Sequence, residues 1–478
     1  MKNEIYDCVE SSFGSYANQK TTKYAVNPAE FFGELQYCDV RHKKTMIELV
    51  KGKLSNMSSS LFEVFGGRGL VKKAYNLLNN DRIDFAYIQS QAISLTKSHL
   101  VGLDRVLVPQ DTTHINLAGH AKTEGLGLQS EKTHGFLAHS AIACTTNGEP
   151  MGLLYQKVWT RIKEEGTFFS LDAEGNPIEE KESYRWRETF SEITKNIPEG
   201  VKITVIADRE CDIYEMLVDG TESESDFIFR VAQNRRTTEG INIQEKLFSQ
   251  PVIGKIEVEI GHNSRTGKPK HTKRFEVRAC TITIKKPMKN KSTTIPENIT
   301  ANYVGVTEID AQNGRENSWI LVTNMPIDTF SAIEEIVRYY SLRWRVETFH
   351  MVLKSGLGIE KAQQRKFESY KPLIHIYSVI ALFIMQLTYV ARFNPKMSCE
   401  YYFDQNEWKL LYRMANKTTT SPKKPYTIQQ AIYYLAIIGN GKRAKSDGPP
   451  GVKTVWKGLQ LLYKTIETLG DIGLSEYI

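Results

Sequence analysis

Residues 339–360 read YYSLRWRVETFHMVLKSGLGIE, and their alternation of charged and apolar residues predicts one long helix with a charged face. At about 100° per residue, four polar side chains fall within an arc of about 60°. These are Tyr340, Arg343, Glu347 and Lys354. The opposite side fits a face packed on a core, and it carries Leu342, Val346, Phe349 and Leu353. A solvated helix surface with an Arg343–Glu347 ion pair, at positions i and i+4, would explain the same pattern.

Two more carboxylates follow apolar strand-like runs. Asp111 comes shortly after RVLVP, Arg105 to Pro109, and Asp208 comes directly after VKITVIA and before a predicted helix. An isolated Asp at a strand end is usually a turn former or a helix cap. Two of them can nevertheless converge at one edge of a sheet. Together with Glu347 they would supply the three carboxylates that suit Mg²⁺-assisted phosphodiester chemistry.

The charge balance favours a polyanionic partner. Lys and Arg number 62 against 55 Asp and Glu, which gives a net charge of +7. The region from Pro28 to Asn80 reads as short helices with an apolar stripe and a basic surface. The basic side chains expected on that surface include Arg41, Lys43, Lys44, Lys51, Lys53, Lys72 and Lys73. Such a bundle suits contacts with DNA phosphates, although an ordinary solvated surface remains the alternative.

The cysteines and apolar segments bear on the compartment. The six cysteines are scattered without a CxxC pair, so neither a zinc site nor a disulfide framework is indicated, and a reducing cytoplasm is the simpler setting. The N-terminal MKNEIYDCVESS lacks the apolar segment of a signal peptide. Pro372 to Ala391 is uncharged and long enough to span a membrane, but it contains His375 and Gln386. We therefore expect a buried core helix.

The spacing Tyr-x2-Arg-x3-Glu-x6-Lys, from Tyr340 to Lys354, resembles the signature helix of the cut-and-paste insertion-sequence transposases of the YREK group, also called insertion sequence family four. The resemblance implies an α/β fold: a ribonuclease H-like core, with a mixed five-stranded sheet flanked by helices, that is interrupted by a β-strand insertion. The long interval between Asp208 and Glu347 is rich in strand-like runs, which agrees with such an insertion. The implied domains are a helical DNA-end-binding domain (1–85), the catalytic core (86–390, insertion approximately 225–325) and a helical dimerisation domain (391–478).

The same resemblance implies roles for individual residues. Asp111, Asp208 and Glu347 would form the catalytic triad and hold two Mg²⁺ ions, for which Mn²⁺ would substitute. Arg343 and Lys354 would hold phosphates near the cut, and Tyr340 would donate its hydroxyl to a phosphate. Arg230 and Trp319 would grip the transposon end, Trp319 by stacking on an extruded base. A core aromatic in a strand is the other interpretation of Trp319.

The activity implied is cut-and-paste excision and integration of double-stranded DNA through metal-dependent phosphoryl transfers with a hairpin intermediate. A homodimer would synapse the two inverted-repeat ends, and each end would be cut by the subunit that does not bind it. The setting would be the bacterial cytoplasm, with the protein on the nucleoid when bound to DNA and without a membrane partner. The final segment VKTVWKGLQLLYKTIETL resembles the dimerisation helices of the family, although an amphipathic helix that closes a monomer fits nearly as well.

Two other functions compete with this interpretation. A phosphohydrolase of the haloacid dehalogenase class also places an Asp after an apolar strand, but Asp111 is followed by Thr112 and Thr113 and lacks a second Asp two positions on. A catalytically silent DNA-binding protein, either a domesticated transposase or an inhibitor, would not need Asp111, Asp208 and Glu347 together. The retention of all three favours an enzyme.

Overall fold

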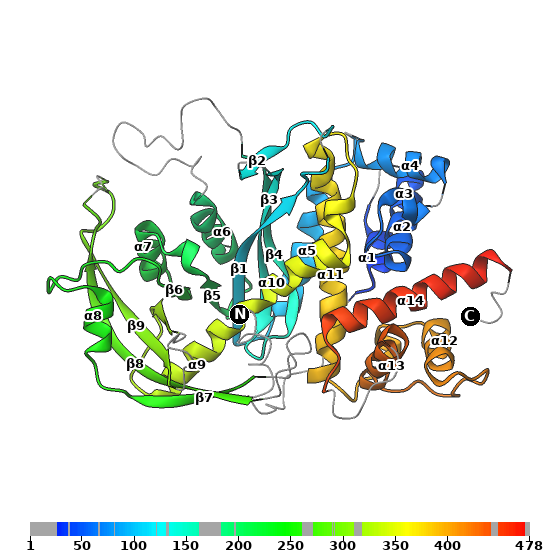
Figure 1. The fold of residues 1–478 in the computed structure, drawn as a ribbon. Helices are drawn as coiled ribbons and strands as arrows, with labels where there is room; N and C mark the ends of the chain where they lie inside the picture. The colour runs from blue at the N-terminus through cyan, green and yellow to red at the C-terminus, as the bar shows by residue number, and fades with distance from the viewer. Residues whose placement is uncertain are drawn as a thin grey trace.

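The computed structural model describes residues 26–36, 39–65, 67–80, 82–120, 122–130, 133–161, 183–195, 197–260, 271–288, 290, 292–309, 318–440 and 448–473. Helices come first along the chain, then a large sheet with its covering helices, and then helices again (Figure 1). The polar N-terminal residues and Cys8 and Cys38 lie outside the described residues. Among the described residues, Cys144, Cys211, Cys280 and Cys399 are free thiols.

A mixed sheet of five strands lies at the centre. Its strands are β1 (Arg105–Asn116), β3 (Thr133–Thr145), β4 (Pro150–Trp159), β5 (Lys202–Ala207) and β6 (Asp226–Arg230). β1, β3 and β4 pair antiparallel, whereas β1, β5 and β6 pair parallel, so the order is β4-β3-β1-β5-β6. The parallel strands are continuous apolar runs, as strands buried on both faces require. This arrangement confirms the expected α/β, ribonuclease H-like core.

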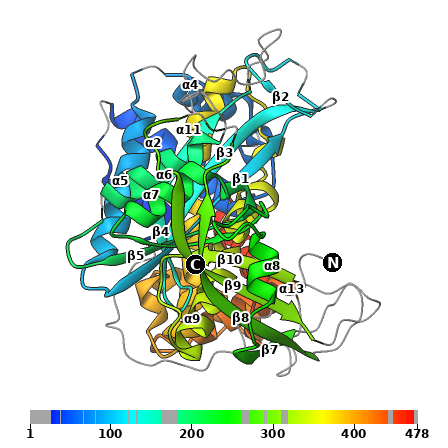
Figure 2. The ribbon, with the colours of Figure 1, turned by 90° about the vertical axis from the view of Figure 1, so that its left-hand side faces the viewer.

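The remaining strands extend the same sheet. They are β7 (Gly254–Ile260), β8 (His271–Lys285), β9 (Asn298–Glu308), β10 (Ser318–Thr323) and the short strand β2 (Gly127–Ser130). Helix α8 (Ile243–Phe248) lies between β6 and β7 in the sequence. β10 pairs antiparallel with β6, and β9, β8 and β7 follow in that order, so the long β7–β9 ribbon projects away from the core (Figure 2). Because β6 pairs with β5, we propose that the insertion begins after β6.

The two faces of the central sheet belong to different clusters of buried side chains. Alternate residues of a strand point to opposite faces. On one face, Leu107 and Ile206 pack with Val346 and Phe349 of the segment that carries the charged motif. On the other face, neighbouring strand residues pack with Trp186 of α6 (Tyr184–Lys195) and with α7 (Tyr214–Glu222). The face on which a strand residue lies therefore decides which helices it can reach.

The prediction of one continuous helix from Tyr339 to Glu360 was wrong. Helix α9 (Phe330–Ser341) ends before a turn at Leu342 and Arg343, and α10 (Trp344–Met351) then begins. α10 continues as a π-helical turn, Val352–Gly356. The amide of Arg343 donates to the carbonyl of Tyr340, three residues back, at 3.0 Å, which tightens the backbone at the break. The predicted apolar side is buried, including Val346, Phe349 and Leu353.

Helix α11 (Tyr370–Phe393) is the apolar segment that is long enough to span a membrane. It passes through the centre of the molecule, and 89% of its most apolar window is buried inside the protein. The N-terminal α5 (Phe85–Leu100) and the C-terminal helices pack around it (Figure 1). The expectation of a core helix is confirmed.

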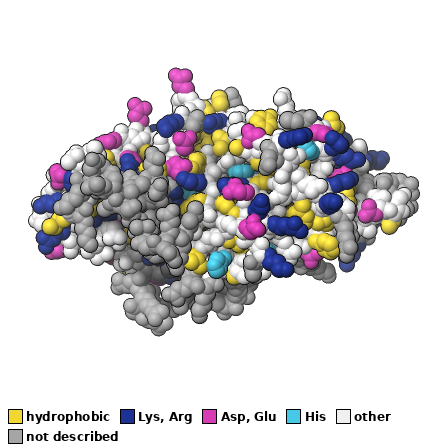
Figure 3. All heavy atoms as spheres, turned by 90° about the horizontal axis from the view of Figure 1, so that it is seen from above, with side chains coloured by type: hydrophobic (Ala, Val, Ile, Leu, Met, Phe, Trp, Pro, Cys, Tyr) yellow, Lys and Arg dark blue, Asp and Glu magenta, His cyan; other side chains and the backbone are white. Residues whose placement is uncertain are grey.

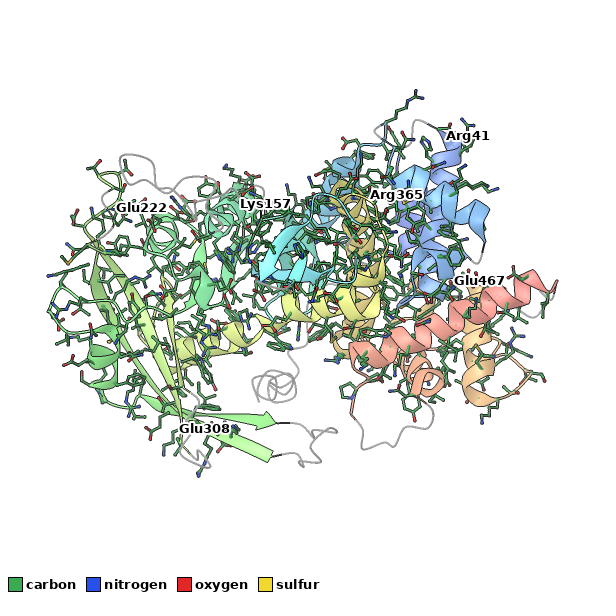
Figure 4. The ribbon with its side chains drawn as sticks, turned by 45° about the horizontal axis from the view of Figure 1, so that its top comes forward. Arg41, Lys157, Glu222, Glu308, Arg365 and Glu467 are labelled. Atoms are coloured by element: carbon green, nitrogen blue, oxygen red, sulfur yellow. The ribbon has the colours of Figure 1, made fainter. Side chains whose placement is uncertain are left out.

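The N-terminal helices form a compact group that carries basic residues. They are α1 (Pro28–Glu34), α2 (Val40–Ser55), α3 (Leu61–Phe65) and α4 (Arg68–Leu78). Lys and Arg side chains are frequent over the right-hand half of the surface in Figure 3, and Arg41 reaches outward at the tip of this group in Figure 4. Lys53 is an exception to the predicted basic surface, because it is buried. Its Nζ donates to the Ser59 carbonyl at 2.6 Å and lies 4.9 Å from the ring centroid of Tyr377 in α11.

The C-terminal part consists of α12 (Gln405–Asn416), α13 (Ile428–Asn440) and α14 (Val452–Asp471). α13 and α14 approach closely at Gly458, where an added Cβ would lie 2.0 Å from the Leu435 carbonyl oxygen. α14 also packs against α2, so the N-terminal and C-terminal helical regions are in contact. Leu461 and Ile472, on or just after α14, are exposed.

Candidate active site

The register of the parallel strands brings Asp111 and Asp208 together. Pro109 pairs with Ile206, and each aspartate lies two residues beyond its member of that pair. A step of two keeps a side chain on the same face, here the face covered by α10. Asp208 follows the end of β5 as predicted. Asp111, which we expected after a short strand, lies inside the longer β1, because β1 continues beyond β5 by pairing with β3, where Asp111 is opposite Ser140.

Glu347 approaches these aspartates from α10. Arg343 contacts both Glu347 and Asp111. The Nη2 atom of Arg343 donates to Oε1 of Glu347, and its Nη1 atom lies 3.6 Å from Oδ2 of Asp111. The Arg343–Glu347 pair is the i, i+4 pair that the sequence suggested. It is not a solvated surface pair, because Arg343 is only 7% exposed. The turn at Leu342 and Arg343 directs this guanidinium into the acidic site.

The three carboxylates influence one another electrostatically. The pKa of Asp111 is raised to about 7, chiefly by burial; Arg343 opposes the rise, and the charges of Asp208 and Glu347 add to it. Burial and Asp208 also raise the pKa of Glu347, against the effect of Arg343. Burial disfavours the charge on Arg343, but Tyr340, Glu347 and Asp111 more than compensate, so its pKa is raised. The site therefore holds more negative charge than one guanidinium neutralises.

The donor set of this site fits divalent cations that prefer oxygen ligands. Mg²⁺ is usually bound through a few carboxylates, and here the charges of Asp208 and Glu347 act on the partly buried Asp111. Within the described residues, no three His, Cys, Asp or Glu side chains are spaced to hold one ion as they stand. Arg343 lies between Asp111 and Glu347, in the place where a cation would offset both charges.

Asp212 is a buried carboxylate, four residues after Asp208, that the sequence analysis did not single out. Its buried carboxylate accepts the amides of Ala232 and Gln233 at 2.6 and 2.7 Å and pairs with Arg235. It therefore fixes an exposed loop, residues 232–236, next to the end of β6. A second Asp four residues after Asp208, in DRECD, was the available signal.

The surroundings of Tyr340 and Lys354, two residues of the charged motif, differ from what the sequence suggested. The ring of Tyr340 is buried at 2% exposure, so a direct phosphate contact requires a change in its surroundings. Nζ of Lys354 donates to the His114 carbonyl at 2.7 Å and lies 3.4 Å from Oε1 of Glu360. Lys354 thus ties the π-helical turn to the end of β1.

Arg230 and Trp319 lie on neighbouring strands. Arg230, at the end of β6, is opposite Leu321 of β10, two residues from Trp319, so Arg230 and Trp319 point to the same face of the sheet. Trp319 packs edge-on against Phe275 with ring centroids 5.3 Å apart, and its buried Nε1 has no hydrogen-bond partner among the described residues. Both side chains are half-buried.

Comparison with known proteins gives two family matches. Residues 179–384 match the transposase DDE domain, a range that includes Asp208 and Glu347 but not Asp111. Residues 379–470 match the transposase Tn5 dimerisation domain, which covers the end of α11 and most of α12–α14. Among solved structures, a piggyBac transposase synaptic complex with hairpin DNA aligns with a TM-score of 0.39 at 9% identity, over 92% of this chain and 82% of that chain.

Proposed function

We propose that this chain, a DDE transposase, moves a DNA element by cut-and-paste transposition and belongs to the hairpin-forming YREK group. The observation that carries the proposal is the approach of Asp111, Asp208 and Glu347 on one face of the sheet: Arg343 contacts both Asp111 and Glu347, and the charges of Asp208 and Glu347 raise the pKa of Asp111.

The proposed cofactor is a pair of Mg²⁺ ions, with Mn²⁺ as a substitute, held by Asp111, Asp208 and Glu347. When bound, the pair would activate the attacking oxygen and stabilise the leaving oxygen of the scissile phosphate. The carboxylates supply the negative charge that such ions need, and β1, β5 and α10 fix the directions from which the three side chains approach.

The cationic residues would bind and orient the DNA backbone. Arg343 can offer a bidentate fork to a phosphate, and Lys354 can offer a point charge, once each exchanges its present carboxylate partner for DNA. Tyr340 contributes to the charge balance of Arg343 and would reach a phosphate only after rearrangement. These assignments follow the spacing by which Tyr340, Arg343, Glu347 and Lys354 resemble the signature helix of the YREK group.

The proposed reaction has four phosphoryl transfers in one site. Water attacks one strand at the element end, the freed 3′ hydroxyl attacks the opposite strand to form a hairpin, water reopens the hairpin, and the 3′ hydroxyl then joins target DNA. A tight hairpin requires distortion of the duplex terminus, which an extruded base relieves. Trp319 would stack on that base, for which it must leave Phe275, and Arg230 on the adjacent strand would hold the neighbouring backbone.

The working unit would be a homodimer on double-stranded DNA. The match of residues 379–470 to a dimerisation domain supports this assembly, and the exposed apolar residues of α14 provide surface for it. The basic N-terminal helices would bind the inverted repeat. We place the protein in the bacterial cytoplasm and on the nucleoid, in keeping with an apolar helix that is buried as core.

Cleavage of a DNA fragment that carries the element end tests the proposal. The wild-type chain should nick this fragment only with Mg²⁺ or Mn²⁺, and a denaturing gel should resolve a hairpin product. Glu347→Gln and Asp208→Asn should abolish nicking while a mobility shift shows that DNA binding persists. Cleavage by these variants at the wild-type rate, or binding without cleavage by the wild type under any divalent ion, would refute it.

A further inference from the structure

Arg185, on α6, connects the two strands that carry the aspartates. Its Nε donates to Oγ1 of Thr112 at 2.8 Å, and its Nη2 donates to Oε2 of Glu210 at 2.8 Å. Thr112 follows Asp111 in β1, and Glu210 lies two residues after Asp208. One guanidinium thus joins two chain segments that are about a hundred residues apart in sequence.

The backbone amides of Thr112 and Glu210 each donate a hydrogen bond to one of the two aspartates. The amide of Thr112 donates to Oδ1 of Asp111 at 2.8 Å, and the amide of Glu210 donates to Oδ1 of Asp208 at 2.8 Å. By holding the side chains of Thr112 and Glu210, Arg185 restrains the two residues whose amides orient these acidic oxygens.

The Thr112 hydroxyl is fixed on its other side by His139. Nε2 of His139 lies 3.1 Å from the Gln110 side-chain oxygen, so this nitrogen carries the proton, and Nδ1 accepts from the Thr112 hydroxyl at 2.8 Å. Burial, followed by the charge of Arg185, lowers the pKa of His139, which keeps the ring neutral. His139 in turn packs edge-on against Trp186, the neighbour of Arg185, with ring centroids 4.7 Å apart. The Thr112 oxygen is therefore an acceptor in a fixed place.

Arg185 approaches from the face of the sheet opposite to Glu347. Thr112 alternates with Asp111 along β1 and lies with His139 on the face covered by α6, whereas Asp111 lies on the face covered by α10. The Arg185 side chain is also almost fully buried, since only 8% is exposed. It is therefore placed to act on the aspartates through Thr112 and Glu210 and not on DNA.

We propose that Arg185 is a positioning residue that sets the separation and orientation of Asp111 and Asp208 for shared binding of divalent cations. The inference rests on the proposed function of this acidic site. Residues that orient metal ligands typically change metal affinity by about 10- to 100-fold when they are replaced. Loss of Arg185 should therefore weaken cation binding more than it changes the rate at saturating cation.

The test compares Arg185→Gln with Arg187→Gln in the full chain. Arg187 lies two residues later on α6 and forms an equally well-bonded pair, with Asp219 at 2.5 and 2.8 Å, away from the acidic site. Mn²⁺ binding is measured directly by electron paramagnetic resonance, and nicking of the end fragment is measured against Mg²⁺ concentration. For Arg185→Gln we expect the Mn²⁺ Kd and the half-saturating Mg²⁺ concentration to rise about 10- to 100-fold. Arg187→Gln should match the wild type in both.

Glu210→Gln is a second variant that should fold normally, because the Glu210 side chain is 60% exposed. It should also raise the Mn²⁺ Kd, by a smaller factor than Arg185→Gln does. In the double variant the combined effect should be less than the sum of the two single effects. Unchanged Mn²⁺ binding in folded Arg185→Gln and Glu210→Gln, or equal weakening in Arg187→Gln, would overturn the proposal. Failure of the proposed function is distinguishable, because the wild type itself would then bind no Mn²⁺ or would not nick DNA.

Discussion

The Nη1 atom of Arg343 lies 3.6 Å from Oδ2 of Asp111, although the two residues come from a helix break and a strand more than two hundred positions apart. The same guanidinium donates to Glu347. Arg343 thus offsets charge at two of the three carboxylates. In the proposed function it exchanges these partners for a phosphate.

Replacement of Arg343 by Gln should therefore impair chemistry more than folding. Loss of a preorganised charged donor typically lowers a catalytic rate by about 10²- to 10³-fold. Arg343→Lys should recover only part of the rate, because an ammonium cannot form the planar fork. The measurement is single-turnover nicking of a preformed protein–DNA complex. Arg338→Gln is the control, since Arg338 donates to the Thr146 carbonyl at 2.8 Å, away from the carboxylates, and nicking by Arg343→Gln at the control rate would contradict this role.

Replacement of Asp111 by Asn should stabilise the cation-free protein above pH 7. The pKa of Asp111 is raised to about 7 in the folded chain, against 3.8 as the ordinary value, chiefly by burial. Below pH 3.8 the group is protonated in both states and costs nothing; the cost develops as pH rises from 3.8 to about 7 and is fully present above that pH. Each tenfold difference in proton affinity between the folded and unfolded chains corresponds to about 1.4 kcal/mol of unfolding free energy.

Chemical unfolding at pH 5 and pH 8 tests this effect. The gain in unfolding free energy of Asp111→Asn over the wild type should be larger at pH 8, and it should shrink when Mg²⁺ is added, because the cation stabilises only the wild type. Nicking should be lost. Asp212→Asn provides the contrast: its carboxylate is fully partnered, so the replacement should destabilise the protein at both pH values. An Asp111→Asn variant that is less stable than the wild type at pH 8 would contradict the prediction.

Lys53 should make stability rise with pH on the alkaline side. Burial, followed by the charge of Lys361, lowers the pKa of Lys53 to about 7 from the ordinary 10.5. Between those values the unfolded chain binds a proton that the folded chain does not, so the unfolding free energy increases with pH. Below pH 7 the folded state carries the full cost of a buried ammonium.

Lys53→Met should remove this slope and raise stability below pH 7. The replacement keeps the apolar length of the side chain but loses the hydrogen bond to Ser59 and the contact with Tyr377, which reduces the gain by about 1 kcal/mol. The control is Lys51→Met on the same helix. Because the Lys51 side chain is exposed, this variant should keep the alkaline rise in unfolding free energy. The same alkaline slope in Lys53→Met and in the wild type would rule out Lys53 as its source.

The sequence predicted the acidic residues better than their surroundings. Asp208 and Glu347 are recognisable from a local apolar run and a local spacing, whereas the register that brings Asp111 beside Asp208 depends on the pairing of β1 with β5. The break at Leu342 and Arg343 is not recognisable, because Leu, Arg and Trp all tolerate a continuous helix. It is held by distant contacts: Nε of Arg345 donates to the Gly148 carbonyl at 2.7 Å, and its guanidinium lies 4.3 Å from the ring centroid of Tyr389.

The sequence did not identify the residues around the acidic side chains, for a related reason. Arg185, His139 and Thr112 come from three separate elements: the pairing of β1 with β3 places His139 beside Thr112, and the packing of α6 on the sheet adds Arg185. Lys53 looked like a surface residue because it shares a basic helix, but the packing of α2 on α11 buries it. Tyr340 fitted the polar arc by angle, yet the end of α9 places its ring in the core. The periodicity of a sequence predicts which side chains share a face of a helix. Which element packs against that face depends on the whole fold.

The crossing of α13 and α14 gives the last prediction, which concerns assembly. At Gly458 an added Cβ would lie 2.0 Å from the Leu435 carbonyl oxygen, and this is backbone that cannot move aside without separating the helices. Gly458→Ala should therefore destabilise the C-terminal helices by about 1 to 3 kcal/mol, the usual cost of overpacking.

Gly470 of the same helix is the matched control, because nothing lies within 4 Å of an added Cβ there. Gly470→Ala should be neutral or stabilising by up to about 1 kcal/mol, since Ala favours a helix over Gly. If the α13–α14 crossing also shapes the dimer surface, Gly458→Ala should lower the dimeric fraction on end DNA in sedimentation experiments, and Gly470→Ala should not. Equal unfolding free energies and equal assembly for the two variants would show that the close crossing contributes neither to stability nor to the dimer.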